Sequence, residues 1–110
     1  MKPAIAERLA QALESGKYRQ GNGYLRQGNA FCCLGVLCNL HAQAHPKIAA
    51  AQPGESYMDQ IAYVPWEVMK WAGMKSHDGS YPGSTLARDN DGGHDFKQIA
   101  KIVRKNQADL

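Results

Sequence analysis

The three cysteines are the most reactive side chains of this sequence, and all lie between residues 32 and 38. Cys38, His41 and His45 are spaced to share one face of a helix, and Cys32 or Cys33 could complete a Cys2His2 zinc set. A cysteine near the start of that helix could instead act as a nucleophile, with a histidine as its base. A cysteine- or zinc-dependent small hydrolase or sensor is therefore the alternative interpretation of the chain.

The surroundings of the cysteines favour a structural role. The run Phe31-Cys-Cys-Leu-Gly-Val-Leu is almost wholly apolar, and free cysteines in such runs commonly pack as small buried hydrophobic residues. Zinc fingers place a turn between their two ligand pairs, whereas this set lies on a single helix. An odd number of cysteines in one tight group is also a poor disulfide framework, which favours a reducing compartment. We expect buried thiols, no metal and no cofactor.

The segment from residue 17 to residue 26 suggests a different chemistry, because it carries three cations and no acid. The Gly-Asn-Gly sequence within it can turn successive backbone N–H groups inward as an anion-binding nest, and a tyrosine there can stack on a base or a ring. The simpler alternative is a hairpin with turn glycines and solvated arginines. The predicted binding residues of this segment are Lys17, Arg19, Gly21, Gly23, Tyr24 and Arg26.

Trp66 is the seventh predicted binding residue. Trp66 and Trp71 lie five positions apart, about 140° around a helix, so both cannot face the centre of the core. Tryptophan is enriched at the energetic centres of protein interfaces, and a plain covering role is the alternative for this pair.

Hydrophobic spacing predicts a mainly helical α+β fold in a single small domain over residues 1–110. The run from Cys33 is apolar on all sides at its start, which is typical of a helix buried by its neighbours. Gly35 inside that helix indicates a close backbone contact. The expected elements are a central helix at about 33–44, covering helices at about 4–14, 65–72 and 95–105, and a small β-hairpin at about 24–32.

The remaining segments give weaker signals. Residues 46–56 are expected to form a surface connection with a Pro53-Gly54 turn. Residues 60–64 could form a short strand, and residues 86–90 one or two helical turns. Asp95 and Gln98 match the capping box of the last helix.

Composition and charge limit the classes of function. The chain has 110 residues, of which 44% are hydrophobic and 21% charged, and a net charge of +3. This charge gives only weak support for nucleic-acid binding. No apolar run approaches the roughly 20 residues of a membrane span, and no signal-peptide core follows Met1. We therefore expect a cytoplasmic protein without a membrane partner.

The motifs Tyr18-Arg-Gln-Gly-Asn-Gly-Tyr-Leu-Arg26, Phe31-Cys-Cys-Leu-Gly-Val-Leu-Cys38 and Val64-Pro-Trp-Glu-Val-Met69, in this order, resemble a family of small phage and prophage proteins. The chain departs from that pattern at Asn39, where aspartate is expected, and at Asp95, where serine is expected.

The resemblance supplies no catalytic residue. It implies a non-enzymatic phage accessory protein in the cytoplasm of a bacterial host, and such proteins often act by binding and blocking, for example as inhibitors of host defence. The expected partner is a host protein or another host macromolecule, or a phosphorylated, nucleotide-like ligand that the protein sequesters. Self-association into a homo-oligomer stays open.

Overall fold

The computed structural model describes residues 1–52 and 54–110. Pro53, part of the expected Pro53-Gly54 turn, lies outside the described residues. The helices are α1 (Pro3–Glu14), α2 (Cys33–Ala44), α3 (Pro46–Ala50), α4 (Trp66–Ala72), α5 (Leu86–Asp91) and α6 (Phe96–Lys105). The strands are β1 (Arg19–Gln20), β2 (Arg26–Gln27), β3 (Ala30–Phe31), β4 (Ser80–Tyr81) and β5 (Ser84–Thr85). The predicted mainly helical α+β fold is confirmed. Of the helices in the described ranges, none combines the length and the hydropathy that crossing a bilayer requires.

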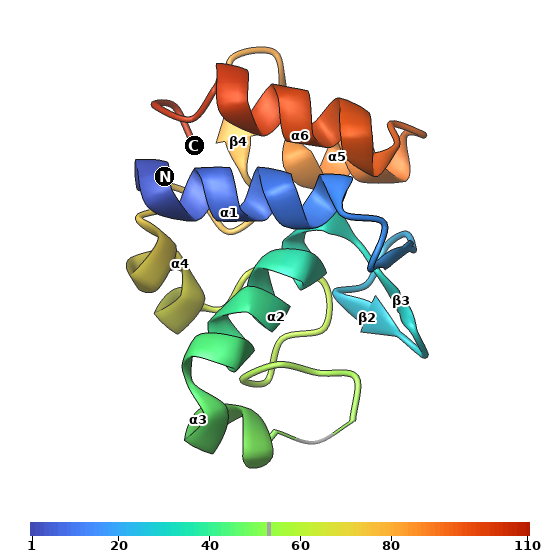
Figure 1. Cartoon of the computed structure of the whole chain (residues 1–110), viewed down its shortest axis with the longest axis vertical. Coiled ribbons are helices and arrows are strands. Elements are labelled where there is room, and N and C mark those ends of the chain that lie inside the picture. Colours follow the sequence, from blue (N-terminus) through green and yellow to red (C-terminus); the bar gives the residue numbers. More distant parts are fainter. Residues whose placement is uncertain (53) are drawn as a thin grey trace.

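The centre of the molecule is α2, as its apolar sequence predicts. Leu34, Val36 and Leu37 are completely buried. Figure 1 shows α1 packed across α2 and α6 packed on the far side of α1, with α4 on one side of α2 and the small sheet on the other. Buried residues from Met1 to Leu110 form a single hydrophobic cluster. The periodic helices thus bury their apolar faces around the one helix that is apolar on most sides.

The predicted hairpin is present and belongs to a larger sheet. β2 and β3 pair antiparallel, and β1 pairs with β3 in parallel, which gives the order β1-β3-β2. The sequence did not predict β1. Parallel strands are not connected by a short turn, so no turn sequence signals that β1 pairs with β3.

One prediction for the middle of the chain was wrong, and a second was incomplete. Residues 60–64 do not form a strand; among the described residues, only an isolated bridge between Tyr57 and Gln60 is found there. The expected surface connection after residue 45 begins with α3, because Pro46 both ends α2 and occupies the first turn of a new helix.

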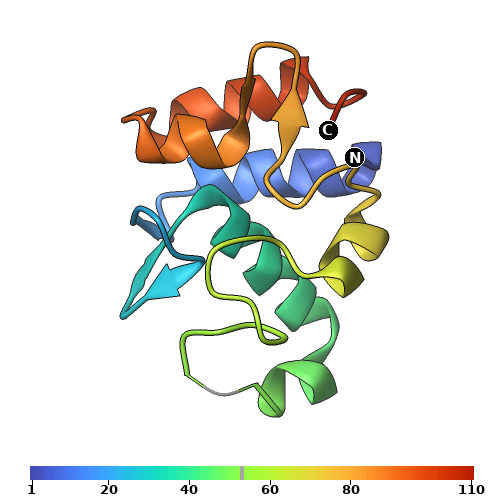
Figure 2. The ribbon, with the colours of Figure 1, turned by 180° about the vertical axis from the view of Figure 1, so that it is seen from behind.

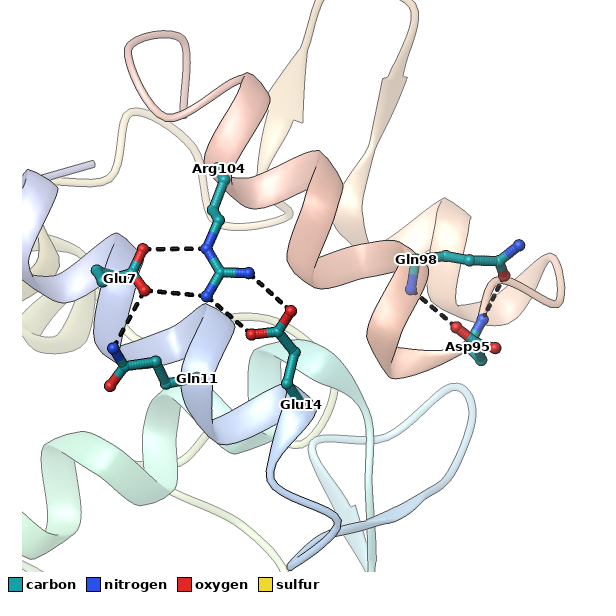
Figure 3. A network of polar contacts seen from close by, with 6 residues as sticks. All are labelled: Glu7, Gln11, Glu14, Asp95, Gln98 and Arg104. Carbon is teal, nitrogen blue, oxygen red and sulfur yellow. Dashed lines mark hydrogen bonds and ion pairs between the residues drawn. The ribbon is translucent and has the colours of Figure 1, made fainter.

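The outer helices begin and end near their predicted residues. The Asp95 side chain accepts a hydrogen bond from the Gln98 backbone N–H at 2.8 Å, and the Gln98 side chain accepts one from the Asp95 N–H at 2.9 Å, which completes the predicted capping box (Figure 3). Gly73 ends α4 with φ of 70°, a left-handed conformation that favours glycine. These local signals fixed the helix ends correctly.

Candidate functional site

The seven predicted binding residues do not converge on one site. Arg26 lines a hollow of about 210 Å³ beside Phe31, which we call the Arg26 hollow. Gly23 lines a second hollow of about 210 Å³, the Gly23 hollow. Lys17 lines a groove of about 340 Å³ beside Arg8 of α1, the Lys17 groove.

The other four, Arg19, Gly21, Tyr24 and Trp66, line none of these three. Tertiary packing has therefore separated cations that are neighbours in the sequence.

The predicted anion-binding nest is occupied by the protein's own side chains. The Gly23 N–H donates to the Asp91 carboxylate at 2.9 Å, and the Gly21 carbonyl accepts from the Asn90 amide at 2.8 Å. The Gly21 N–H donates to the Phe31 carbonyl at 2.8 Å. The backbone donors of Gly21 and Gly23 that we predicted for an external anion are thus used inside the fold.

Asn90 holds this arrangement together and was missed by sequence reasoning. Its side-chain oxygen accepts from the Cys33 N–H and from the Gln20 amide, both at 3.1 Å. The residue is only 1% exposed. One buried amide therefore joins β1, the start of α2 and α5. The polar run at residues 89–91 was visible in the sequence, but its partners lie almost 70 positions away.

Four exposed apolar side chains come from two chain segments that a backbone hydrogen bond joins. Tyr24, Ile61, Tyr63 and Trp66 are 46%, 57%, 46% and 65% exposed. The Leu25 N–H donates to the Ile61 carbonyl at 2.7 Å, which brings Tyr24 beside the segment that leads to Trp66. Figure 2 shows residues 57–65 crossing in front of α2, from the sheet toward α4. We call Tyr24, Ile61, Tyr63 and Trp66 the aromatic surface.

The sequence predicted two of the four members of this surface. Ile61 and Tyr63 were placed in an expected strand. This segment crosses α2 as an irregular chain instead, and both side chains are exposed. The Tyr63 ring packs edge-on against His77, with ring centroids 4.7 Å apart. The aromatic surface also borders the Gly23 hollow, which Tyr63 lines together with Asp78, Arg88 and Asp91.

The cysteines are buried, as predicted. Cys32, Cys33 and Cys38 are 5%, 0% and 4% exposed, and no disulfide joins them. Burial raises the pKa of all three thiols above the ordinary cysteine value. A thiol acts as a nucleophile or metal ligand in its deprotonated form, so this environment suppresses both kinds of chemistry.

The histidines that could complete a zinc set have other partners. His41 Nδ1 lies 2.7 Å from the Tyr57 hydroxyl, and the His41 ring stacks on His45 with centroids 4.1 Å apart. Burial, and then the proximity of His45, lower the pKa of His41. Within residues 1–52 and 54–110, no group of three or more His, Cys, Asp or Glu residues is placed to hold a metal ion. This geometry favours a structural role for the cysteines over the cysteine- or zinc-dependent alternative.

A protein-family model, described as a domain of unknown function (DUF8296), matches residues 1–107, so the chain belongs to that family. No curated protein and no solved structure matches the chain.

Proposed function

We propose that this member of the DUF8296 family is a non-enzymatic phage accessory protein that binds a host protein through the aromatic surface. The observation that carries the proposal is the exposure of apolar side chains on two chain segments that the Leu25–Ile61 hydrogen bond joins. Five large apolar side chains are exposed in the described ranges, and four of them form this surface. Large apolar side chains exposed near one another on a small protein commonly mark interaction sites.

The composition of the aromatic surface suits a protein partner. Tyrosine and tryptophan are enriched at the energetic centres of interfaces, where each buries a large apolar area while ordering few torsion angles. Charged groups adjoin the patch, because Asp78, Arg88 and Asp91 line the neighbouring Gly23 hollow. An apolar centre with a polar edge is the usual anatomy of a specific interface.

The positions of the cations support a protein partner over a sequestered phosphorylated or nucleotide-like ligand. Lys17 and Arg26 line different hollows, and Arg19 extends from the exposed strand β1. The Gly23 N–H is paired with a carboxylate, which would repel a phosphate.

The proposed phage origin and bacterial cytoplasm rest on the resemblance of the motifs alone. In that setting, the proposed role is to block a host protein, for which a component of host defence is the first candidate.

The proposal is tested in two stages. The tagged protein captures its partner from bacterial lysate, mass spectrometry identifies it, and the dissociation constant is then measured with both proteins purified. We expect Trp66→Ala to weaken binding by about tenfold or more, because central tryptophans carry a large share of interface energy. Trp66 is 65% exposed, so the variant should keep its melting temperature. Ile48→Ser is the matched control, since Ile48 is exposed but lies on α3, away from the aromatic surface.

Other outcomes would contradict the proposal. If Arg19→Gln and Arg26→Gln abolish binding while Trp66→Ala leaves it unchanged, the partner binds the charged segment instead. If sedimentation shows a dimer of the wild-type protein that Trp66→Ala dissociates, the surface joins two copies of this chain.

A further inference from the structure

The Arg26 hollow combines an apolar floor with two opposite charges, and none of the four residues of the aromatic surface lines it. Phe31, Cys38 and Ala42 contribute the apolar floor. The exposed residues Arg26 and Glu55 both line the hollow. Their charges come from different parts of the chain, one from β2 and the other from the segment after α3.

Arg26 is held in place but keeps its charge unpaired. Its Nε donates to the Gly28 carbonyl at 2.9 Å, and its guanidinium carbon lies 5.4 Å from the centre of the Phe31 ring. Within the described part of the chain, no carboxylate lies within ion-pair distance of Arg26. The guanidinium therefore has a fixed position, and its terminal nitrogens remain able to bind a carboxylate.

The other polar groups of the wall are mostly satisfied by the fold. The Tyr57 hydroxyl contacts His41, and the Asn39 amide donates to the Tyr18 hydroxyl at 2.6 Å. The Gln52 amide donates a hydrogen bond to the Ile48 carbonyl, and its side-chain oxygen accepts one from the Met58 N–H. Glu55, by contrast, has no hydrogen bond or ion pair to another described residue. The unpaired charges of the hollow are thus one cation and one anion, which line the same space without pairing with each other.

From this arrangement we propose that the Arg26 hollow binds a free α-amino acid with an apolar side chain. The ligand's carboxylate pairs with Arg26, its ammonium group with Glu55, and its side chain packs on Phe31 and Ala42. A volume of about 210 Å³ suits a molecule of this size, because it lies below the range of pockets for drug-sized ligands. Since both charged side chains are exposed, we expect a dissociation constant between micromolar and millimolar.

The test is a titration of the isotope-labelled protein followed by backbone amide NMR. L-Leucine, L-phenylalanine and L-methionine are each added, and the amide signals of Phe31, Ala42 and Tyr57 are expected to shift in a saturable manner. N-acetyl-leucine lacks the ammonium charge and leucinamide lacks the carboxylate, so each is expected to bind about tenfold more weakly. Inorganic phosphate and adenosine monophosphate serve as the phosphorylated probes.

Variants assign the two charges. Arg26→Gln and Glu55→Gln are each expected to weaken leucine binding by about tenfold, and each should keep its melting temperature because both side chains are exposed. Arg19→Gln is the matched control, because Arg19 is an exposed cation of the same sheet outside the hollow. Trp66→Ala should leave leucine binding unchanged, which separates this site from the proposed protein-binding surface.

Three results would overturn the proposal. The first is the absence of saturable shifts with all three amino acids. The second is N-acetyl-leucine binding as tightly as leucine, which would remove the role of Glu55. The third is a stronger response to phosphate or adenosine monophosphate than to the amino acids, which would identify a simple anion site at Arg26.

Discussion

At Gly35, α2 packs against the backbone of Leu25. The two backbones are so close that no side chain fits between them. A Cβ atom placed on Gly35 would lie 1.7 Å from the Leu25 carbonyl oxygen. The clash would be with backbone, which cannot move aside as a flexible side chain does. The close approach predicted from a glycine inside an apolar helix is therefore confirmed.

Gly35→Ala is expected to lower the free energy of unfolding by about 3 kcal/mol, because the new methyl group must push α2 away from Leu25. Urea denaturation measures the change. Gly16→Ala is the matched control, since Gly16 has a φ of +75° but nothing within 4 Å of a new Cβ. That control should lose only about 1 kcal/mol through backbone strain. If both variants lose the same free energy of unfolding, the close contact with Leu25 does not exclude a side chain at position 35.

The burial of Cys32, Cys33 and Cys38 leads to a prediction about reactivity. Because burial raises the pKa of each thiol, few thiolates form near pH 8, and a reagent cannot reach them without an opening of the fold.

A colorimetric disulfide reagent should therefore label the native protein slowly, and label three thiols rapidly once urea unfolds it. Fast labelling of any one thiol in the native protein would restore the cysteine-based alternative.

At the scale of elements, α1 and α6 are joined by a charged bridge as well as by their apolar faces. Arg104 of α6 reaches both Glu7 and Glu14 of α1, with N–O distances from 2.7 to 3.0 Å (Figure 3). Glu7 and Glu14 lie seven positions apart, two turns along one side of the helix, so one guanidinium fits between them. No local pattern in the sequence identifies this bridge, because Arg104 lies 97 and 90 positions from its two partners.

Arg104→Gln is expected to lower the melting temperature near pH 7 modestly, because exposed ion pairs contribute little. The difference from wild type should shrink in about 1 M salt, which screens the charges. Lys97→Gln, at an exposed cation of the same helix, is the matched control. An undiminished difference at high salt would mean that Arg104 acts through packing instead.

The bridge also predicts a pH dependence. Hydrogen bonds from Arg104 hold the pKa of Glu7 and Glu14 below their ordinary values. The folded state therefore binds fewer protons than the unfolded state around pH 4, so this contribution is complete above the unfolded pKa of about 4.3. It is lost as pH falls through the lower folded pKa, and the difference between wild type and Arg104→Gln should disappear in acid.

At the scale of the whole molecule, the first and last residues of the sequence meet in one packed region. The Met1 ammonium group donates to the Gln107 carbonyl at 3.1 Å, and the Gln107 amide donates to the Met1 carbonyl at 2.5 Å. The Lys75 N–H donates to the Leu110 carbonyl at 2.9 Å, and Leu110 is 1% exposed. These contacts join the N-terminus before α1, the segment after α4 and the segment after α6.

Leu110→Ala is expected to lower the free energy of unfolding by about 3 kcal/mol, because it empties a buried site formed by distant segments. Thermal or urea denaturation measures the loss. Asp109→Ala is the control at an exposed neighbour and should change stability little. A small effect of Leu110→Ala would mean that the last residues pack loosely in solution.

The sequence alone determined the helices other than α3, the hairpin and the burial of the thiols. Each depends on information within about ten residues, such as the spacing of apolar side chains, a proline or glycine at a helix end, or the Asp95 cap. It did not determine which surface is available for binding.

The nest at Gly23 is paired with Asp91, 68 positions away, and the neighbouring cations line separate hollows. The aromatic surface includes both Tyr24 and Ile61 because the Leu25 N–H pairs with the Ile61 carbonyl, 36 positions away. A hollow or an exposed patch depends on which distant segments pack together, and only the tertiary structure decided that.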